Sequence, residues 1–364
     1  MTSGLHTDGG AANYSRGMRT HIAVRLAATA ALLLSAVGFG AFAPAAACAC
    51  GGVVSPGNSA TVHDEVALAG WDGRRETIVM RLALESGTDH AALIVPTPTP
   101  ARVSAGSAGT FPELARLTAP EIVTERHWFA GDGGGETSAA APPGRGPTIL
   151  EQVRLGPIEA TTLSGGSLDG LRNWLGANGY EMKPEVTATL DPYLRENWSF
   201  VAVKLTGAGT LTGALDPIRL TFDSDRFVYP MRMSRAAESP QTVRLYLLGA
   251  HRLQRTDADA GTQYNGVEFA GRIGDIEDQE LRELTGGGND YLTELSVGIH
   301  HPASITTDFV FAAAPGDETY RRRVTDIEYV ELFGFPAGTV ILGVVSLAAA
   351  LVLFAVVRVV RRPS

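Results

Sequence analysis

The sequence predicts a β-rich α+β fold with antiparallel sheets, a small helical insert and one C-terminal transmembrane helix. Three observations support this fold class. Apolar runs between residues 48 and 331 mostly alternate with a period of two, which is typical of half-buried strands. The window 167–195 instead shows the spacing of amphipathic helices. The stretch 333–357 is apolar and carries no charge. The sheets could form one domain or two sandwich-like units.

Residues 1–47 are predicted to be an N-terminal extension followed by a signal peptide. A charged start precedes an apolar run that ends near Phe42, and its cations are Arg16, Arg19 and Arg25. Small residues then lead to a cleavage site between Ala47 and Cys48. Acylation of Cys48 is the alternative, although a bulky aliphatic residue three positions earlier, usual before a lipidated cysteine, is missing.

The N-terminal portion of the outer domain covers residues 48–130. Glu76–Leu84 and Ala91–Val95 are expected to be strands that pair as a hairpin, and Pro112–Leu117 is expected to be a short helix. The segment 131–147, GDGGGETSAAAPPGRGP, has the composition of a flexible linker.

The C-terminal portion covers residues 148–331 and contains the helical insert. Ser167 can cap a helix over Leu168–Ala177, and a second helix is expected from Pro184 to Leu194. Trp174 and Trp198 are interpreted as core residues of this insert. The expected strands are Ile149–Leu155, Ser199–Leu205, Ile218–Phe222, Phe227–Met233, Val243–Leu248 and Ile305–Phe311.

The C-terminal segment 333–357 is predicted to cross a membrane. At ~1.5 Å of rise per residue, a helix of this length spans a hydrocarbon core of ~30 Å. Arg358, Arg361 and Arg362 follow and fit a short cytoplasmic tail, 358–364. Together with the signal peptide, they predict a single-pass cell-membrane protein whose bulk is extracytoplasmic.

Charge and cysteine content restrict the possible partners and stabilising features. The chain has 39 acidic and 30 basic residues and a net charge of −9, which argues against nucleic acid as a partner. Its two cysteines, Cys48 and Cys50, lie at the start of the mature chain. The outer domain is therefore expected to fold without a disulfide scaffold.

No familiar catalytic or metal-binding motif is present in the sequence. There is no HExxH segment, no GxSxG elbow after a strand and no EF-hand loop. We assign no catalytic residue, metal or cofactor. Tyr229, Met231 and Arg232, in the segment YPMRM, are the candidate binding face, with Pro96–Pro98 as a second place to look. Proline beside a strand also marks an edge or a turn.

Several segments together resemble an uncharacterised family of exported, membrane-anchored bacterial proteins, mainly actinobacterial, which is classed as a domain of unknown function. In order they are CACGGVV at 48–54, WDG at 71–73, ALIVPTPTPA at 92–101, LGPIEATTL at 155–163, LRNWLGANGY at 171–180, SFVAVKL at 199–205, LDPIRLTF at 215–222, VYPMRMSRAA at 228–237 and VRLYLLGAHR at 243–252. The resemblance implies an exported, anchored protein. It supplies no activity, cofactor or catalytic residue.

The expected function is that of a membrane-anchored extracytoplasmic binding or structural protein of the bacterial cell envelope. Two alternatives belong to other classes. One is an envelope hydrolase whose site is assembled from distant residues, such as His127 with carboxylates and arginines. The other is an accessory or sensor subunit that pairs with another envelope protein through its membrane helix.

Overall fold

The computed structural model describes residues 47–48, 51–56, 60–129, 152–153, 159–163, 168–180, 182–207 and 209–360. These residues belong to one compact unit of the chain, Pro44–Ser364. The predicted signal peptide up to residue 46, the linker 131–147, Cys50, Arg361 and Arg362 lie outside the described residues.

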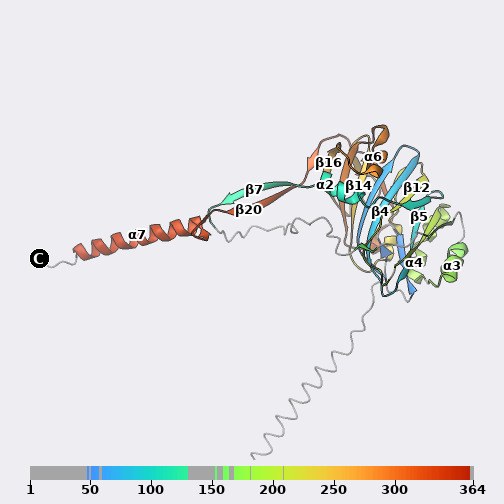
Figure 1. Cartoon of the computed structure of the whole chain (residues 1–364), viewed down its shortest axis with the longest axis horizontal. Coiled ribbons are helices and arrows are strands. Elements are labelled where there is room, and N and C mark those ends of the chain that lie inside the picture. Colours follow the sequence, from blue (N-terminus) through green and yellow to red (C-terminus); the bar gives the residue numbers. More distant parts are fainter. Residues whose placement is uncertain are drawn as a thin grey trace, which may run out of the picture. The chain divides into compact units, whose positions relative to one another are not determined.

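A ten-stranded sheet forms one layer of the fold (Figure 1). The order is β19 (Tyr320–Arg321), β16 (Tyr264–Arg272), β17 (Tyr291–Ile299), β14 (Gln241–Gly249), β3 (Thr61–Trp71), β4 (Arg75–Glu85), β11 (Thr212–Leu215) and β8 (Gln152–Val153); β12 (Ile218–Asp223) also pairs with β4, and β6 (Arg102–Ala105) with β12. Most neighbouring strands are antiparallel, whereas β14 runs parallel to β3 and β11 parallel to β8.

A five-stranded antiparallel sheet forms the second layer. Its order is β1 (Ala47–Cys48), β2 (Gly51–Val54), β5 (His90–Thr97), β10 (Ser199–Thr206) and β9 (Glu159–Leu163). β5 pairs with β10 along its whole length, from His90 opposite Thr206 to Thr97 opposite Ser199. Each sheet therefore contains strands from both sides of the linker, and the two portions build a single sandwich.

The sandwich has apolar residues on both faces of both sheets. Between the sheets, Ile78 and Met80 of β4 share a core cluster with Leu93 of β5. The outer face of the five-stranded sheet is covered by α3 (Leu168–Ala177), α4 (Pro184–Ala188) and α5 (Asp191–Arg195). The outer face of the ten-stranded sheet is covered by α2 (Thr110–Leu117) and α6 (Gln279–Leu284). The β-rich class with few helices is confirmed.

A small third sheet contributes side chains to the central core. It contains β13 (Phe227–Tyr229), β18 (Phe309–Ala313) and β15 (Leu253–Arg255). Short 3₁₀ segments lie close to these strands in sequence: η2 (Arg232–Ala236) and η4 (Pro302–Ser304). Phe227, Tyr229 and Phe309 point into the core cluster that the two large sheets share.

Some local predictions were wrong, and each difference has a physical cause. The strand expected to reach Met233 ends at Tyr229, because Pro230 has no N–H to donate. The helix expected over 184–194 is divided into α4 and α5, since Pro192 cannot continue the hydrogen-bond ladder. The expected hairpin does not form, because β4 and β5 belong to different sheets.

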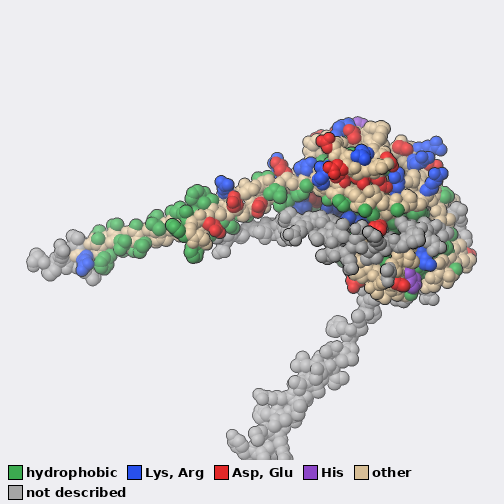
Figure 2. Space-filling model, viewed as in Figure 1, with side chains coloured by type: hydrophobic (Ala, Val, Ile, Leu, Met, Phe, Trp, Pro, Cys, Tyr) green, Lys and Arg blue, Asp and Glu red, His purple; other side chains and the backbone are tan. Residues whose placement is uncertain are grey.

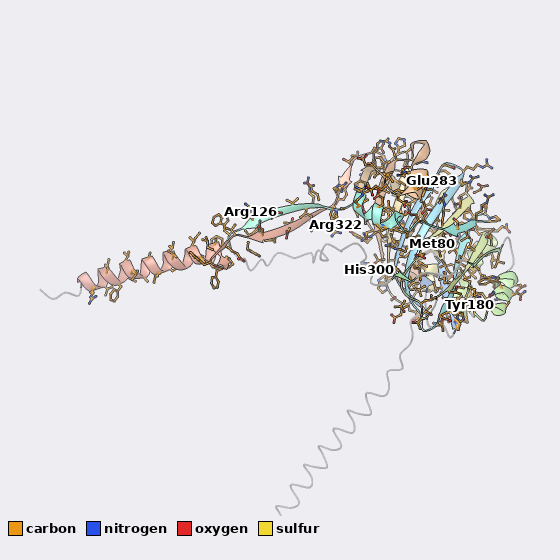
Figure 3. The ribbon with its side chains drawn as sticks, viewed as in Figure 1. Met80, Arg126, Tyr180, Glu283, His300 and Arg322 are labelled. Carbon is orange, nitrogen blue, oxygen red and sulfur yellow. The ribbon has the colours of Figure 1, made fainter. Side chains whose placement is uncertain are left out.

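A two-stranded ribbon precedes the apolar C-terminal helix. β7 (Glu121–His127) pairs in parallel with β20 (Arg323–Tyr329), and Arg126 lies on this ribbon (Figure 3). A tight hairpin of β21 (Glu331–Leu332) and β22 (Phe335–Pro336) follows. Residues 333–336 are therefore not helical, and the helix α7 is Ala337–Val360.

α7 is the one helix of the described residues that is long and apolar enough to cross a membrane. Its span Ala337–Arg358 has a mean hydropathy of 3.0. Figure 2 shows hydrophobic side chains along its length. Arg358, one of the three predicted flanking cations, lies in the last turn. This helix supports anchoring to a membrane.

Candidate functional site

The three residues of the predicted binding face lie inside the protein. Tyr229 and Met231 are fully buried, and the Tyr229 hydroxyl donates a hydrogen bond of 2.5 Å to Oε1 of the buried Glu65. The side chain of Arg232 is 12% exposed. Ala47 and Cys48, at the predicted cleavage site, form the edge strand β1.

Arg232 joins the helical layer to the rest of the sandwich. Its Nε donates to Oδ2 of Asp308 at 2.8 Å, and its terminal nitrogens donate to both oxygens of Glu196. The guanidinium carbon lies 4.1 Å from the ring centroid of Tyr193 and 5.5 Å from that of Trp198. This cluster is held by charge-assisted hydrogen bonds and cation–π contacts.

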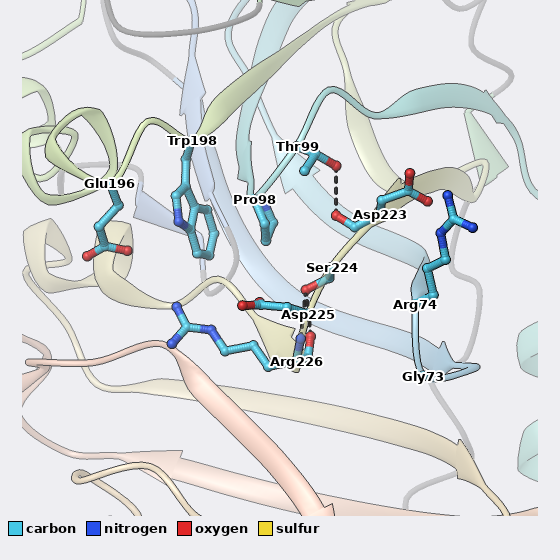
Figure 4. A pocket seen from close by; sticks show the side chains of 10 residues that line it. All are labelled: Gly73, Arg74, Pro98, Thr99, Glu196, Trp198, Asp223, Ser224, Asp225 and Arg226. Atoms are coloured by element: carbon cyan, nitrogen blue, oxygen red, sulfur yellow. Dashed lines mark hydrogen bonds between the residues drawn. The ribbon is translucent and has the colours of Figure 1, made fainter.

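A surface cleft of about 790 Å³ lies next to this cluster and shares Glu196 and Trp198 with it. Four turns that are far apart in sequence line the cleft (Figure 4). The other lining residues are Gly73, Arg74, Pro98, Thr99, Asp223, Ser224, Asp225 and Arg226. The cleft contains Pro98, from the second segment that the sequence singled out.

Local hydrogen bonds hold these turns in place. The turn between β3 and β4 is closed by Asp72, whose Oδ1 accepts from the backbone N–H groups of Arg74 and Arg75. The indole N–H of Trp71 donates to the carbonyl of Ser224, and Thr99 Oγ1 donates to the carbonyl of Asp223. Three of the four cleft turns are therefore tied directly to one another.

The fourth turn follows α5 and carries Glu196 and Trp198. It ends the helix with a Schellman arrangement, in which Trp198 N donates to Tyr193 O and Asn197 N donates to Leu194 O. Asn197 has the positive φ of 57° that this motif requires. The turn directs the Trp198 ring toward Pro98 in the cleft (Figure 4).

The cleft presents charges of both signs. Side chains of Arg74, Asp225 and Arg226 make no hydrogen bond or close ion pair with any residue that the structure describes, and Arg226 points toward Trp198 and Glu196 (Figure 4). The hydrogen bond from Arg232 keeps the pKa of Glu196 below its ordinary value, and the charge of Arg226 adds to this effect. Among the described residues, two guanidinium groups and one carboxylate of the cleft therefore have no partner.

Glu76, at the start of β4, is a buried carboxyl with incomplete hydrogen bonding. Its Oε2 accepts a bond of 3.2 Å from Val228 N, and its Oε1 has no partner among the described residues. Burial raises the pKa of Glu76 well above 4.5, and the bond from Val228 offsets this only in part. Compared with the unfolded chain, the folded protein therefore favours the protonated, neutral form of this carboxyl.

We expect Glu76→Gln to stabilise the protein at pH 8 and to change little at pH 4. A carboxyl with a raised pKa binds a proton on folding. The folded protein with Glu76 therefore loses stability as the pH rises above the unfolded pKa of 4.5. The gain is about 1.4 kcal/mol for each pKa unit between the folded and unfolded values that the pH range covers. Urea unfolding of both proteins across this range measures it. An equal difference at both pH values would contradict the assignment.

The described residues contain no group of three or more His, Cys, Asp or Glu side chains placed to hold a metal ion. His127, which the hydrolase alternative invoked, is exposed at the end of β7, 3.5 Å from Glu125 Oε2. His300 lies after β17, away from the ribbon (Figure 3). Neither histidine lines the cleft.

Comparison with known proteins supports a family and no activity. The model of DUF2330, described as an uncharacterised protein conserved in bacteria, matches residues 44–312. No curated protein matches the sequence. The crystal structure of baculovirus P35 is similar to this chain with a TM-score of 0.31 and 9% identity, over 72% of this chain and 95% of that one.

Proposed function

The chain belongs to DUF2330, a family of uncharacterised proteins conserved in bacteria, and we propose that it is a membrane-anchored binding protein of the cell envelope. Its bulk lies outside the cytoplasm and its cleft binds a polypeptide segment of another envelope protein. The observation that carries the proposal is the cleft itself, which Arg74, Asp225 and Arg226 line without partners of their own among the described residues.

The chemistry of the cleft favours a polypeptide over other ligands. The cleft is lined by two arginines and by acidic side chains at 196, 223 and 225, so it lacks the excess of positive charge that a phosphate backbone requires. Trp198 is only 4% exposed, which leaves little ring surface for stacking on a sugar. A peptide can instead offer carboxylates to the two arginines, an ammonium or guanidinium group to Asp225 and an apolar side chain to the half-buried Pro98.

The topology of the chain supports the envelope location. α7 is suited to span a membrane, and a predicted signal peptide at the N-terminus would export everything between the two. Export by the signal peptide and retention by α7 would together place the body of the chain, and its cleft, on the envelope side of the membrane.

A photo-crosslinking amino acid in place of Thr99 tests this function in the full-length protein in intact cells. We expect a covalent polypeptide adduct that a matched probe at Asp169, exposed on α3, does not give. Arg74→Ala with Arg226→Ala should reduce the adduct yield at least about tenfold, the equivalent of ~1.4 kcal/mol of binding energy. An adduct that persists in the double variant, or that forms equally at Asp169, would refute the proposal.

A further inference from the structure

Five large aromatic side chains are exposed where the ribbon meets α7. Their exposed fractions are large for such residues, from 42% to 92%. They come from two segments that are distant in the sequence: Trp128 and Phe129 after β7, and Tyr329, Phe333 and Phe335 before α7. Exposed apolar side chains grouped in this way mark an interaction surface.

Backbone hydrogen bonds bring the two segments to the first turn of α7. The β7–β20 pairing ends with His127 opposite Tyr329. Val330 N then donates to His127 O at 3.0 Å, and Gly338 N donates to Trp128 O. The end of β7 is therefore bound directly to the start of the membrane helix.

Gly338 permits this close contact. A Cβ at this position would lie only 2.3 Å from the ring carbon Cδ1 of Phe129 and 2.5 Å from Trp128 O. The turn before the helix is equally tight, because Phe333 and Gly334 both adopt positive φ, 57° and 80°. Phe129 consequently packs on the helix backbone while half of its surface stays exposed.

The side chains change in character along the ribbon toward the helix. Exposed ion pairs join β7 to β20, Arg323 with Glu121 at 2.8 Å and Arg126 with Glu328 at 3.2 Å. The aromatic residues follow, and then the uncharged apolar stretch that begins at Ala337. This order matches the change from water through the headgroup region to hydrocarbon. Tryptophan and tyrosine are enriched in the headgroup region.

We propose that these five residues form an aromatic collar that inserts into the headgroup–acyl boundary of the bilayer. The partner of the collar is the lipid surface. In addition to α7, the residues that follow β7 would then also contact the membrane. The proposal rests on the membrane anchoring that the proposed function includes. Trp128 and Phe129 are central to it, because they belong to a segment that is not continuous with the helix.

Fluorescence quenching in vesicles tests the collar with the full-length protein. We expect phosphatidylcholine with bromine near the headgroup to reduce tryptophan emission more than phosphatidylcholine with bromine near the chain ends. Trp128 is one of four tryptophans, and Trp128→Phe should abolish this quenching. The control Trp174→Phe, in α3, should leave it unchanged.

Flotation of the same vesicles separates the two levels of the proposal. Protein that floats with the vesicles while Trp128→Phe leaves the quenching intact would overturn the collar and leave the anchor in place. Protein that does not float would refute the anchor and the collar together. Quenching that is stronger with deep bromines would also overturn an interfacial position for Trp128.

Discussion

Replacing Asp308 with alanine is expected to lower the free energy of unfolding by about 3–5 kcal/mol, the cost typical of breaking a buried ion pair. Asp308 is 5% exposed, and its Oδ1 accepts from Tyr193 Oη, Met231 N and Arg232 N. Its Oδ2 accepts from Arg232 Nε. Alanine leaves these donors without their partner and the Arg232 charge half compensated, so the helical layer should loosen first. Urea unfolding followed by tryptophan emission measures the change, because Trp198 is part of this cluster.

Two further variants separate the hydrogen bonds of Asp308 from its charge. Asp308→Asn keeps an oxygen acceptor for the backbone donors, so its loss should be smaller than that of alanine. Asp169→Ala removes a carboxylate that is 85% exposed and should change stability by less than about 0.5 kcal/mol. Equal effects of Asp308→Ala and Asp169→Ala would show that the cluster does not hold the layers together.

The parts of the fold that depend on local pattern could be predicted from the sequence. The helix Leu168–Ala177 has the predicted bounds, since its cap signal and apolar spacing agree. β4 extends the predicted run by one residue at each end. Strand pairing could not be predicted, because β5 meets β10 across a long stretch of intervening chain.

Strands were also missed where small or charged residues interrupt the apolar alternation. β3 includes Asp64, Glu65 and Gly70, and its register shifts at a bulge between Val62 and Asp64. At 305–308 a strand was predicted that does not form: the strand expected over Ile305–Phe311 begins only at Phe309, as β18. There, the Asp259 carboxylate accepts from Thr306 N and Thr307 N, donors that a strand would use for its ladder.

The candidate site shows the same division between local and long-range information. The sequence singled out Arg232, but its partners Glu196 and Asp308 come from separate segments that carry no motif. The strands predicted over Ile218–Phe222 and Phe227–Met233 imply a turn between β12 and β13. Its role in a cleft depends on the Trp71 and Thr99 hydrogen bonds, which only the tertiary structure brings together.

We expect Arg255→Ala to cost about 3–5 kcal/mol, because it leaves the Asp257 charge buried without its partner. The two side chains are 2% and 1% exposed and are joined by two hydrogen bonds of 3.0 and 2.7 Å. Arg255 also donates to Gln263 and Asn265 and lies 3.6 Å from the ring centroid of Phe309. The variant therefore removes a charge, two further hydrogen bonds and a cation–π contact from the core side of β15.

A double-mutant cycle with Asp257→Ala distinguishes a buried pair from two independent residues. Because removing both charges leaves neither one uncompensated, the double variant should lose well under the sum of the single losses. The surface pair of Arg126 and Glu328, 73% and 59% exposed, is the matched control. There the single losses should stay below about 1 kcal/mol, since solvent screens exposed pairs. Additive losses at Arg255 and Asp257 would mean that their attraction contributes nothing to folding, and that hydrogen bonding by each residue alone accounts for its burial.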